Sequence, residues 1–131
     1  MGTLQAGTAT VNITPELGCH LVGYFADRIA DHIHDELLVK AIVLTDGETT
    51  LGLVTCDLIS LPVATVNAAK ALIEERTGIA PANVLISATH THTAPSAVGA
   101  LGTPGHAGVR RLVGAAHRRC LCHGAEEPSA C

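Results

Sequence analysis

A single helical stretch flanked by two apolar runs constrains the fold of this chain more than any other feature. The run 51–55 (LGLVT) precedes the helical stretch 63–76, and the run 84–89 follows it. Apolar residues recur at helical spacing in the middle segment, and Gly78 supplies a natural C-terminal cap. Two strands joined by a helix are normally parallel neighbours in one sheet. The sequence therefore predicts a βαβ crossover.

A further apolar segment, 37–44, comes just before the first run of this crossover. Asp46-Gly47 lies between the two and is a strong signal for a hairpin turn. An earlier segment, 4–13, alternates small or apolar residues with polar ones, which is typical of a first strand. Together these patterns indicate an α/β fold: a mixed sheet with a β-hairpin and a βαβ crossover.

The composition is that of a folded domain with a core of small aliphatic side chains. Of the 131 residues, 47% are hydrophobic, 15% are charged and only 2% are aromatic, which is far too apolar for a disordered chain. A net charge of −4 with eight Lys and Arg offers no basic patch, which argues against nucleic acid as a partner. No apolar run approaches the roughly 20 residues needed to span a membrane.

The N-terminal segment and the cysteines bear on the cellular compartment of the protein. Residues 1–15 contain neither a charged leader nor a long apolar stretch, so no secretion signal is visible and we expect a cytoplasmic protein by default. Cys19 and Cys56 are distant from one another in an apolar chain, and we expect reduced core cysteines rather than a disulfide. No pattern indicates the oligomeric state.

The sequence changes character over its last segment. Residues 106–131 hold four of the eight basic residues, all of them Arg, together with three His and three Cys. Runs rich in Arg, Ala, Gly, His and Cys are typical of GC-rich DNA read in a wrong frame. We therefore expect a native segment, 1–105, followed by a frameshifted or disordered tail, 106–131. The alternative is a metal clip of Cys120, Cys122 and His123, which has fewer than the four ligands of a usual zinc site.

Two histidines, His90 and His92, stand directly after the apolar run 84–89. In an extended backbone, residues i and i+2 point to the same side, so both rings are expected on one face, with Thr91 on the other. The carboxyl end of a buried strand is also where α/β sheets place their ligands. The pair therefore predicts a metal site; the alternative is a pair of surface or hydrogen-bonded histidines.

Other polar groups are candidates for the surroundings of this pair. Asp57 follows the neighbouring strand, and we expect it either to hold the second nitrogen of a ligating imidazole or to cap the next helix. His34 is expected either to line the pocket or to make a structural hydrogen bond. The irregular segment 17–33 is either an active-site loop or a surface excursion, and its Tyr24 and Arg28 are interpreted as packing or surface residues.

Three blocks of the sequence carry a resemblance to a known family. They are AGTATVNITPELG, HDELLVKAIVLTDGETTLGLVTCDLI and TGIAPANVLISATHTHTAPS, and the resemblance covers about residues 5–104. In this order and approximate spacing they resemble the N-terminal region of the neutral/alkaline (non-lysosomal) ceramidase family. The most specific piece is HTHTAP, where family members usually read HTHSGP. The change from Ser to Thr keeps a hydroxyl, whereas the change from Gly to Ala removes backbone freedom from the turn.

The resemblance implies a zinc-dependent amidohydrolase that cleaves the N-acyl bond of ceramide to give sphingosine and a fatty acid. It implies that His90 is a Zn²⁺ ligand and that His92 is the catalytic residue beside the metal, where it meets the substrate or an anion. Zinc suits this chemistry because it polarises the amide carbonyl and lowers the pKa of a bound water to about 7. The family's other ligands, a His, a Glu and a Tyr, come from far downstream. Residues 1–105 are thus expected to be the N-terminal part of a larger catalytic domain, a fragment inactive by itself.

Two other interpretations of the histidine pair stay open. One is a different HxH metallohydrolase with a compact site of its own, built with Asp57 and His34. The other is a non-catalytic remnant that binds nothing specific. Tight stoichiometric zinc would favour the first, and an unchanged metal content after His90→Ala would favour the second.

Overall fold

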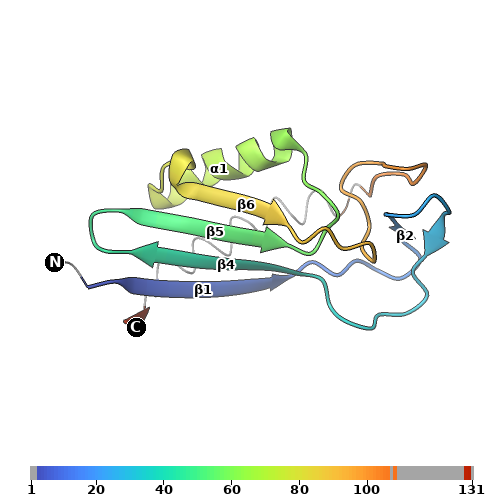
Figure 1. Cartoon of the computed structure of the whole chain (residues 1–131), viewed down its shortest axis with the longest axis horizontal. Helices are drawn as coiled ribbons and strands as arrows, with labels where there is room; N and C mark the ends of the chain where they lie inside the picture. The colour runs from blue at the N-terminus through green and yellow to red at the C-terminus, as the bar shows by residue number, and fades with distance from the viewer. Residues whose placement is uncertain (1–2, 107, 109–128, 131) are drawn as a thin grey trace.

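The computed structural model of the chain describes residues 3–106, 108 and 129–130. Within these residues the strands, in chain order, are β1 (Gln5–Asn12), β2 (His20–Leu21), β3 (Arg28–Ile29), β4 (Leu38–Thr45), β5 (Thr50–Cys56), β6 (Val84–Ala88) and β7 (Ser129–Ala130). Five of them form one mixed sheet in the order β6-β5-β4-β1-β7, and β2 and β3 form a second, small sheet. The small sheet lies beyond the carboxyl ends of β1, β5 and β6 (Figure 1).

β4 and β5 form the predicted hairpin, with Ala41 opposite Val54 in an antiparallel register. In its turn, the carboxylate of Asp46 accepts hydrogen bonds from the backbone N–H groups of Glu48 (3.0 Å) and Thr49 (2.8 Å). On its other side, β4 pairs antiparallel with β1 over the whole length of both strands. The three strands predicted before the helix are thereby confirmed.

The predicted crossover is confirmed as well. The helix α1 (Val63–Thr77) begins after Pro62 and ends at Gly78, whose N–H donates to the carbonyl oxygen of Glu74 at 2.9 Å. Gly78 has a φ of 74°, a left-handed conformation that glycine adopts without steric cost. A short 3₁₀ turn, η1 (Pro81–Asn83), then leads into β6, which pairs parallel with β5.

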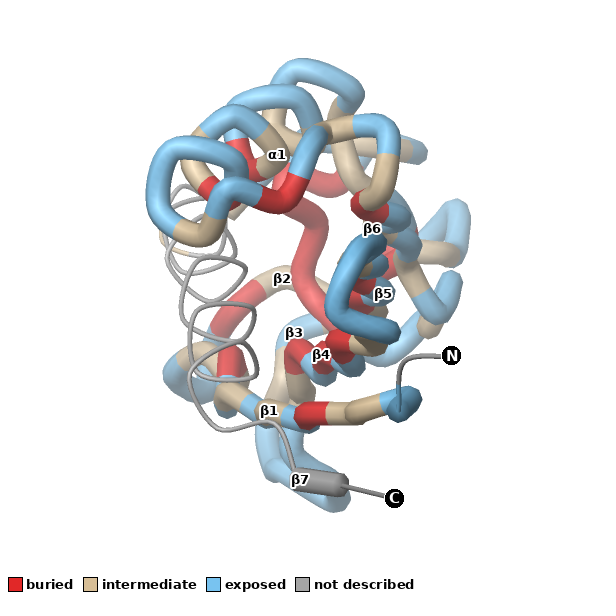
Figure 2. Tube along the Cα trace, turned by 90° about the vertical axis from the view of Figure 1, so that its left-hand side faces the viewer, coloured by how far each residue is buried: buried red, intermediate tan, exposed pale blue. Residues whose placement is uncertain are grey.

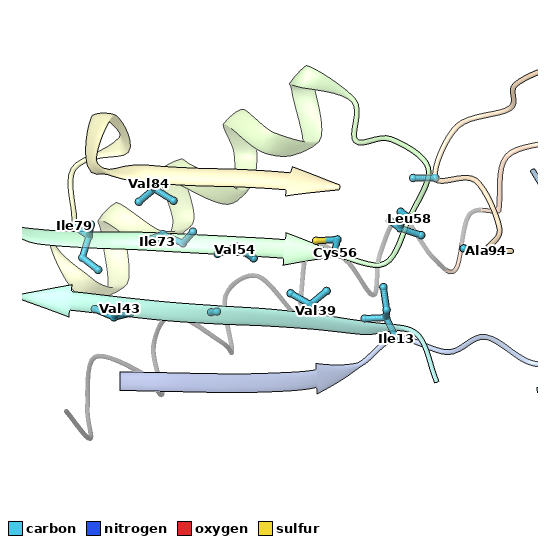
Figure 3. Packing of buried hydrophobic residues seen from close by; sticks show 12 residues of the cluster. Ile13, Val39, Val43, Val54, Cys56, Leu58, Ile73, Ile79, Val84 and Ala94 are labelled. Carbon is cyan, nitrogen blue, oxygen red and sulfur yellow. The ribbon is translucent and has the colours of Figure 1, made fainter. Parts of the chain in front are cut away.

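The core lies between the sheet and α1. Alternate residues of β4 and β5 are buried on this face, as the two-residue period of a strand requires. Figure 2 shows buried positions on the strands and on the side of α1 that faces them, and Figure 3 shows the side chains that meet there. They are small and aliphatic, as the composition predicts, and the most deeply buried include Ile13, Val39, Val54, Cys56, Leu58, Ile73 and Val84.

The opposite face of the sheet carries an exposed apolar row beside polar residues such as Thr8 and Lys40. Ile42, Leu53 and Leu85 pair in one lateral row across β4, β5 and β6, and they are 44%, 40% and 62% exposed. Strands with apolar residues on both faces are typical of sheets that are covered on both sides. The row of Ile42, Leu53 and Leu85 is thus an exposed apolar strip on this open face of the sheet.

The predicted tail, 106–131, lies almost entirely outside the described residues. Within it the structure describes two single residues and β7, which pairs antiparallel with the start of β1. The clip of Cys120, Cys122 and His123 lies outside the described residues, and the frameshift stays a prediction. In the described part of the chain, no helix is long and apolar enough to cross a membrane.

Candidate functional site

The backbone changes direction before it reaches the histidine pair. β6 ends two residues before His90, which adopts a left-handed conformation with a φ of 63°. The N–H of Thr89 donates to the carbonyl oxygen of Cys56 (2.9 Å), and the N–H of His90 donates to that of Leu58 (3.0 Å). The expectation of an extended backbone over 89–93 is therefore wrong, because the chain bonds to the turn after β5 instead of continuing the sheet.

The ring of His90 is held by a backbone carbonyl. Its Nδ1 lies 2.7 Å from the carbonyl oxygen of Ile59, in the turn that follows β5. A carbonyl can only accept, so Nδ1 carries the proton and Nε2 of the neutral ring keeps its lone pair. Imidazoles that bind metals are commonly oriented in this way, by a hydrogen bond from the other nitrogen. His90 as a whole is exposed.

The rings of His90 and His92 lie side by side. Their centroids are 5.1 Å apart and their planes are inclined at 72°. Tyr24 makes an edge-to-face contact with His92, at a centroid distance of 5.9 Å and an angle of 86°. The two imidazoles are thus neighbours, as the sequence predicted, although the backbone that brings them together is not extended.

Segment 17–33 brings two further side chains to His92. Within this segment β2 and β3 pair antiparallel and fix the ends of the loop 22–27. From β3, Arg28 donates from Nη2 to the carbonyl oxygen of His92, and its guanidinium carbon lies 4.0 Å from the ring centroid of Tyr24. The sequence analysis interpreted Tyr24 and Arg28 as packing or surface residues and did not connect them with His92, because Arg28 and His92 are 64 positions apart and no local pattern links them.

Asp57 joins the end of β5 to the start of β4. Its Oδ2 accepts a hydrogen bond from the N–H of Leu38 at 2.9 Å, and its own N–H donates to the carbonyl oxygen of Leu38 at 2.9 Å. The acceptor at Nδ1 of His90 is the carbonyl of Ile59. The structure therefore gives Asp57 a role in strand pairing and gives His90 a backbone carbonyl as the partner of its second nitrogen.

A cavity of about 550 Å³ opens beside the site, on the side of the threonines. Its lining includes Thr91 and Thr93, together with Asp57 and His34, and neither His90 nor His92. The side chain of His34 is 86% exposed, and its Nδ1 lies 2.8 Å from a carboxylate oxygen of the next residue along the chain. The cavity is thus lined by Thr91 and Thr93 and not by the two histidines that alternate with them.

Two titratable groups of the cavity lining have shifted pKa values. Burial raises the pKa of the Cys19 thiol, so this group stays protonated at neutral pH and is a poor nucleophile. A hydrogen bond from His32, at 2.6 Å, lowers the pKa of the Asp31 carboxyl. The cavity therefore combines an unreactive buried thiol with an ionised carboxylate.

His90 meets the requirements for one zinc ligand. Its Nδ1 is held from behind, its Nε2 has a lone pair, and a second imidazole lies next to it. Within the ranges that the structure describes, no three His, Cys, Asp or Glu residues lie close enough to hold a metal ion together. A catalytic zinc takes three protein ligands, so a compact site of the histidine pair with Asp57 and His34 is not formed by these residues.

Comparison with known proteins places the fold. No protein family matches the sequence, and no curated protein matches it. The structure is similar to that of neutral ceramidase from Pseudomonas aeruginosa, with a TM-score of 0.85 and 18% identity over 99% of this chain. It is also similar to a ceramidase complexed with C2, with a TM-score of 0.80 and 19% identity over 99% of this chain. In both cases the chain spans 22% of the matched chain, so it has the fold of one part of a ceramidase, as the motif blocks implied.

Proposed function

We propose that this chain is part of a zinc-dependent amidohydrolase of the ceramidase type, in which His90 binds the metal and His92 stands beside it. The observation that carries the proposal is the hydrogen bond of 2.7 Å between Nδ1 of His90 and the carbonyl oxygen of Ile59. This bond leaves Nε2 available next to the ring of His92. The ceramidase-like fold is a second, independent support.

His90 and His92 have different roles in the proposed hydrolysis of an amide. An amide is a poor electrophile, and zinc, when bound, polarises its carbonyl and makes hydroxide available near neutral pH. His90 holds the metal through Nε2, while the carbonyl of Ile59 keeps the imidazole in the required tautomer and orientation. The ring of His92, 5.1 Å from that of His90, can donate a hydrogen bond to a substrate oxygen or hold a proton there.

We propose ceramide or a related N-acyl amide lipid as the substrate class. The support is that both matched structures are ceramidases and that their fold is shared over 99% of this chain. Because the chain spans 22% of those structures, the remaining zinc ligands would come from other parts of a longer polypeptide. The 131-residue chain by itself is therefore expected not to turn over substrate.

Zinc binding by three proteins tests the role of His90. They are the wild type, His90→Ala and the control His32→Ala, compared by competition with a chromophoric chelator. His32 is a suitable control because it is a second imidazole, 76% exposed, with its Nδ1 also in a hydrogen bond. We expect weak zinc binding, because the described residues of this chain supply only one of the ligands, with His32→Ala binding as the wild type does and His90→Ala binding more weakly than both. Equal affinities of all three proteins would overturn the assignment.

A ceramide hydrolysis assay with added zinc tests the need for further ligands. The wild-type chain is expected to release fatty acid at the background rate. Turnover above background that disappears in His90→Ala would show that the chain is complete, and would contradict this part of the proposal. Turnover that persists in His90→Ala would contradict the role of His90.

A further inference from the structure

We propose that Arg28 is a positioning residue for His92: it holds the main chain of the second histidine, while Tyr24 holds the imidazole ring. The inference rests on the proposed function, in which His90 and His92 form the site. Arg28 belongs to β3, and its pairing with Leu21 of β2 fixes the point from which the side chain extends.

The guanidinium of Arg28 makes two contacts at once. Its Nη2 donates to the carbonyl oxygen of His92, and its carbon lies 4.0 Å from the ring centroid of Tyr24, within the range of a cation–π interaction. Tyr24 in turn meets the ring of His92 edge to face at 5.9 Å. The three side chains therefore form a closed set of contacts in which both the main chain and the ring of His92 are held.

The carbonyl of His92 lies outside any strand or helix, so no hydrogen bond of a regular element holds it. Backbone hydrogen bonds hold the chain before and after His92. The N–H of His90 donates to the carbonyl oxygen of Leu58, in the turn after β5, and the N–H of Val22 donates to the carbonyl oxygen of Ala94 at 3.1 Å. Arg28 supplies a charged donor between these two points, and charged donors make stronger hydrogen bonds than neutral ones. Without this hydrogen bond, the peptide group of His92 could change its orientation while the hydrogen bonds of His90 and Ala94 remain.

Arg28 has an unfavourable feature beside these two contacts. Its Nε is buried and has no hydrogen-bond partner among the described residues. A lysine would satisfy the carbonyl of His92 without that penalty, but it cannot stack a planar cation on Tyr24. The guanidinium is the group that makes both contacts, so its effect falls on the orientation of His92.

The test compares Arg28→Gln and Arg28→Lys with the wild type, in the full chain, by NMR. The matched control is Arg76→Gln, because Arg76 is exposed at the C-terminal end of α1. Zinc ion alone is the probe, and the readouts are the ring resonances of His90 and His92 and the nuclear Overhauser effect between Tyr24 and His92. We expect Arg28→Gln to lose that effect and to shift the ring resonances of His92, while zinc still moves the ring resonances of His90, whose partner is the carbonyl of Ile59. Arg28→Lys should keep part of the Overhauser effect, and Arg76→Gln should match the wild type.

An intact Overhauser effect between Tyr24 and His92 in Arg28→Gln, with the ring resonances of His92 unchanged, would overturn the inference. If the wild-type rings do not respond to zinc, the proposed function fails, and the Overhauser effect alone then decides the role of Arg28. Should Arg28→Gln fail to fold, Tyr24→Leu takes its place, since it removes the ring contact and leaves the donor. That variant is also expected to shift the ring resonances of His92, and unchanged resonances would overturn the inference.

Discussion

The backbone of Gly23 lies directly against the imidazole ring of His92. A β-carbon at position 23 would lie 2.5 Å from Cγ of His92 and 2.7 Å from its Nδ1, and the φ of Gly23 is 114°. No side chain fits at that distance, and residues other than glycine rarely adopt that φ. The loop between β2 and β3 can therefore approach the histidine pair this closely only because residue 23 is a glycine.

Gly23→Ala is accordingly expected to destabilise the chain more than Gly18→Ala does. Gly18 has a φ of 86° but no atom within 4 Å of an added β-carbon, so it reports backbone strain alone, about 1–2 kcal/mol. Gly23→Ala adds the clash with His92, and we expect it to lose roughly a further 1–3 kcal/mol of unfolding free energy. Urea denaturation measures both losses, and equal values would show that the contact does not constrain the loop.

Asp57→Ala is expected to lower stability without changing the zinc response of His90. The N–H of Leu38 would lose its carboxylate acceptor, at a cost of about 1–3 kcal/mol. The ring of His90 should be unaffected because its acceptor is the carbonyl of Ile59. Asp35→Ala, at a carboxylate that is 88% exposed, is the control for loss of charge. Denaturation and zinc binding are measured on the same samples; weaker zinc binding in Asp57→Ala alone would contradict this account.

Leu85→Glu is expected to reduce self-association of the chain. Leu85 is 62% exposed and lies in the apolar row with Ile42 and Leu53, and contiguous apolar patches of this kind promote association. Leu17 is 53% exposed but lies outside the sheet, which makes Leu17→Glu a matched control. Light scattering over a concentration series measures the effect. An equal reduction in both variants would mean that the added charge, and not the open face, is responsible.

The stability of the chain in acid is expected to depend partly on Asp46. Hydrogen bonds from the N–H groups of Thr49 and Glu48 lower the pKa of its carboxyl in the folded state. Its contribution is therefore complete above the unfolded-state pKa, about 3.9, and is lost as the pH falls through the lower folded value. Asp46→Asn keeps an acceptor oxygen but does not titrate. Its unfolding free energy should change less than that of the wild type between about pH 4 and pH 2; equal slopes would contradict the prediction.

Most of the sheet could be predicted because its elements end at residues with strong backbone preferences. Asp46-Gly47 marks the hairpin turn, and Gly78 ends the helix in the left-handed conformation that the sequence predicts. β2 and β3 could not be predicted, since strands of two residues are too short to show alternation. Their pairing depends on the way segment 17–33 packs against the rest of the chain.

The site could be predicted only in part. The apolar run placed His90 and His92 at the carboxyl edge of the sheet, but no local signal indicates that His90 leaves the strand with a φ of 63°. The contacts of Gly23 and Arg28 with His92 join distant parts of the sequence. Such contacts depend on tertiary packing, and neither the spacing of the histidines nor the composition of the loop contains them.

The most direct test of the central claim is the tautomer of His90 in the metal-free chain, measured by long-range ¹H–¹⁵N correlation of its ring. We predict a proton on Nδ1, held by the carbonyl of Ile59, and an unprotonated Nε2 whose ¹⁵N resonance moves when zinc is added. A proton on Nε2, or an Nε2 resonance that saturating zinc leaves unmoved, would contradict the claim that this histidine is ready to bind a metal.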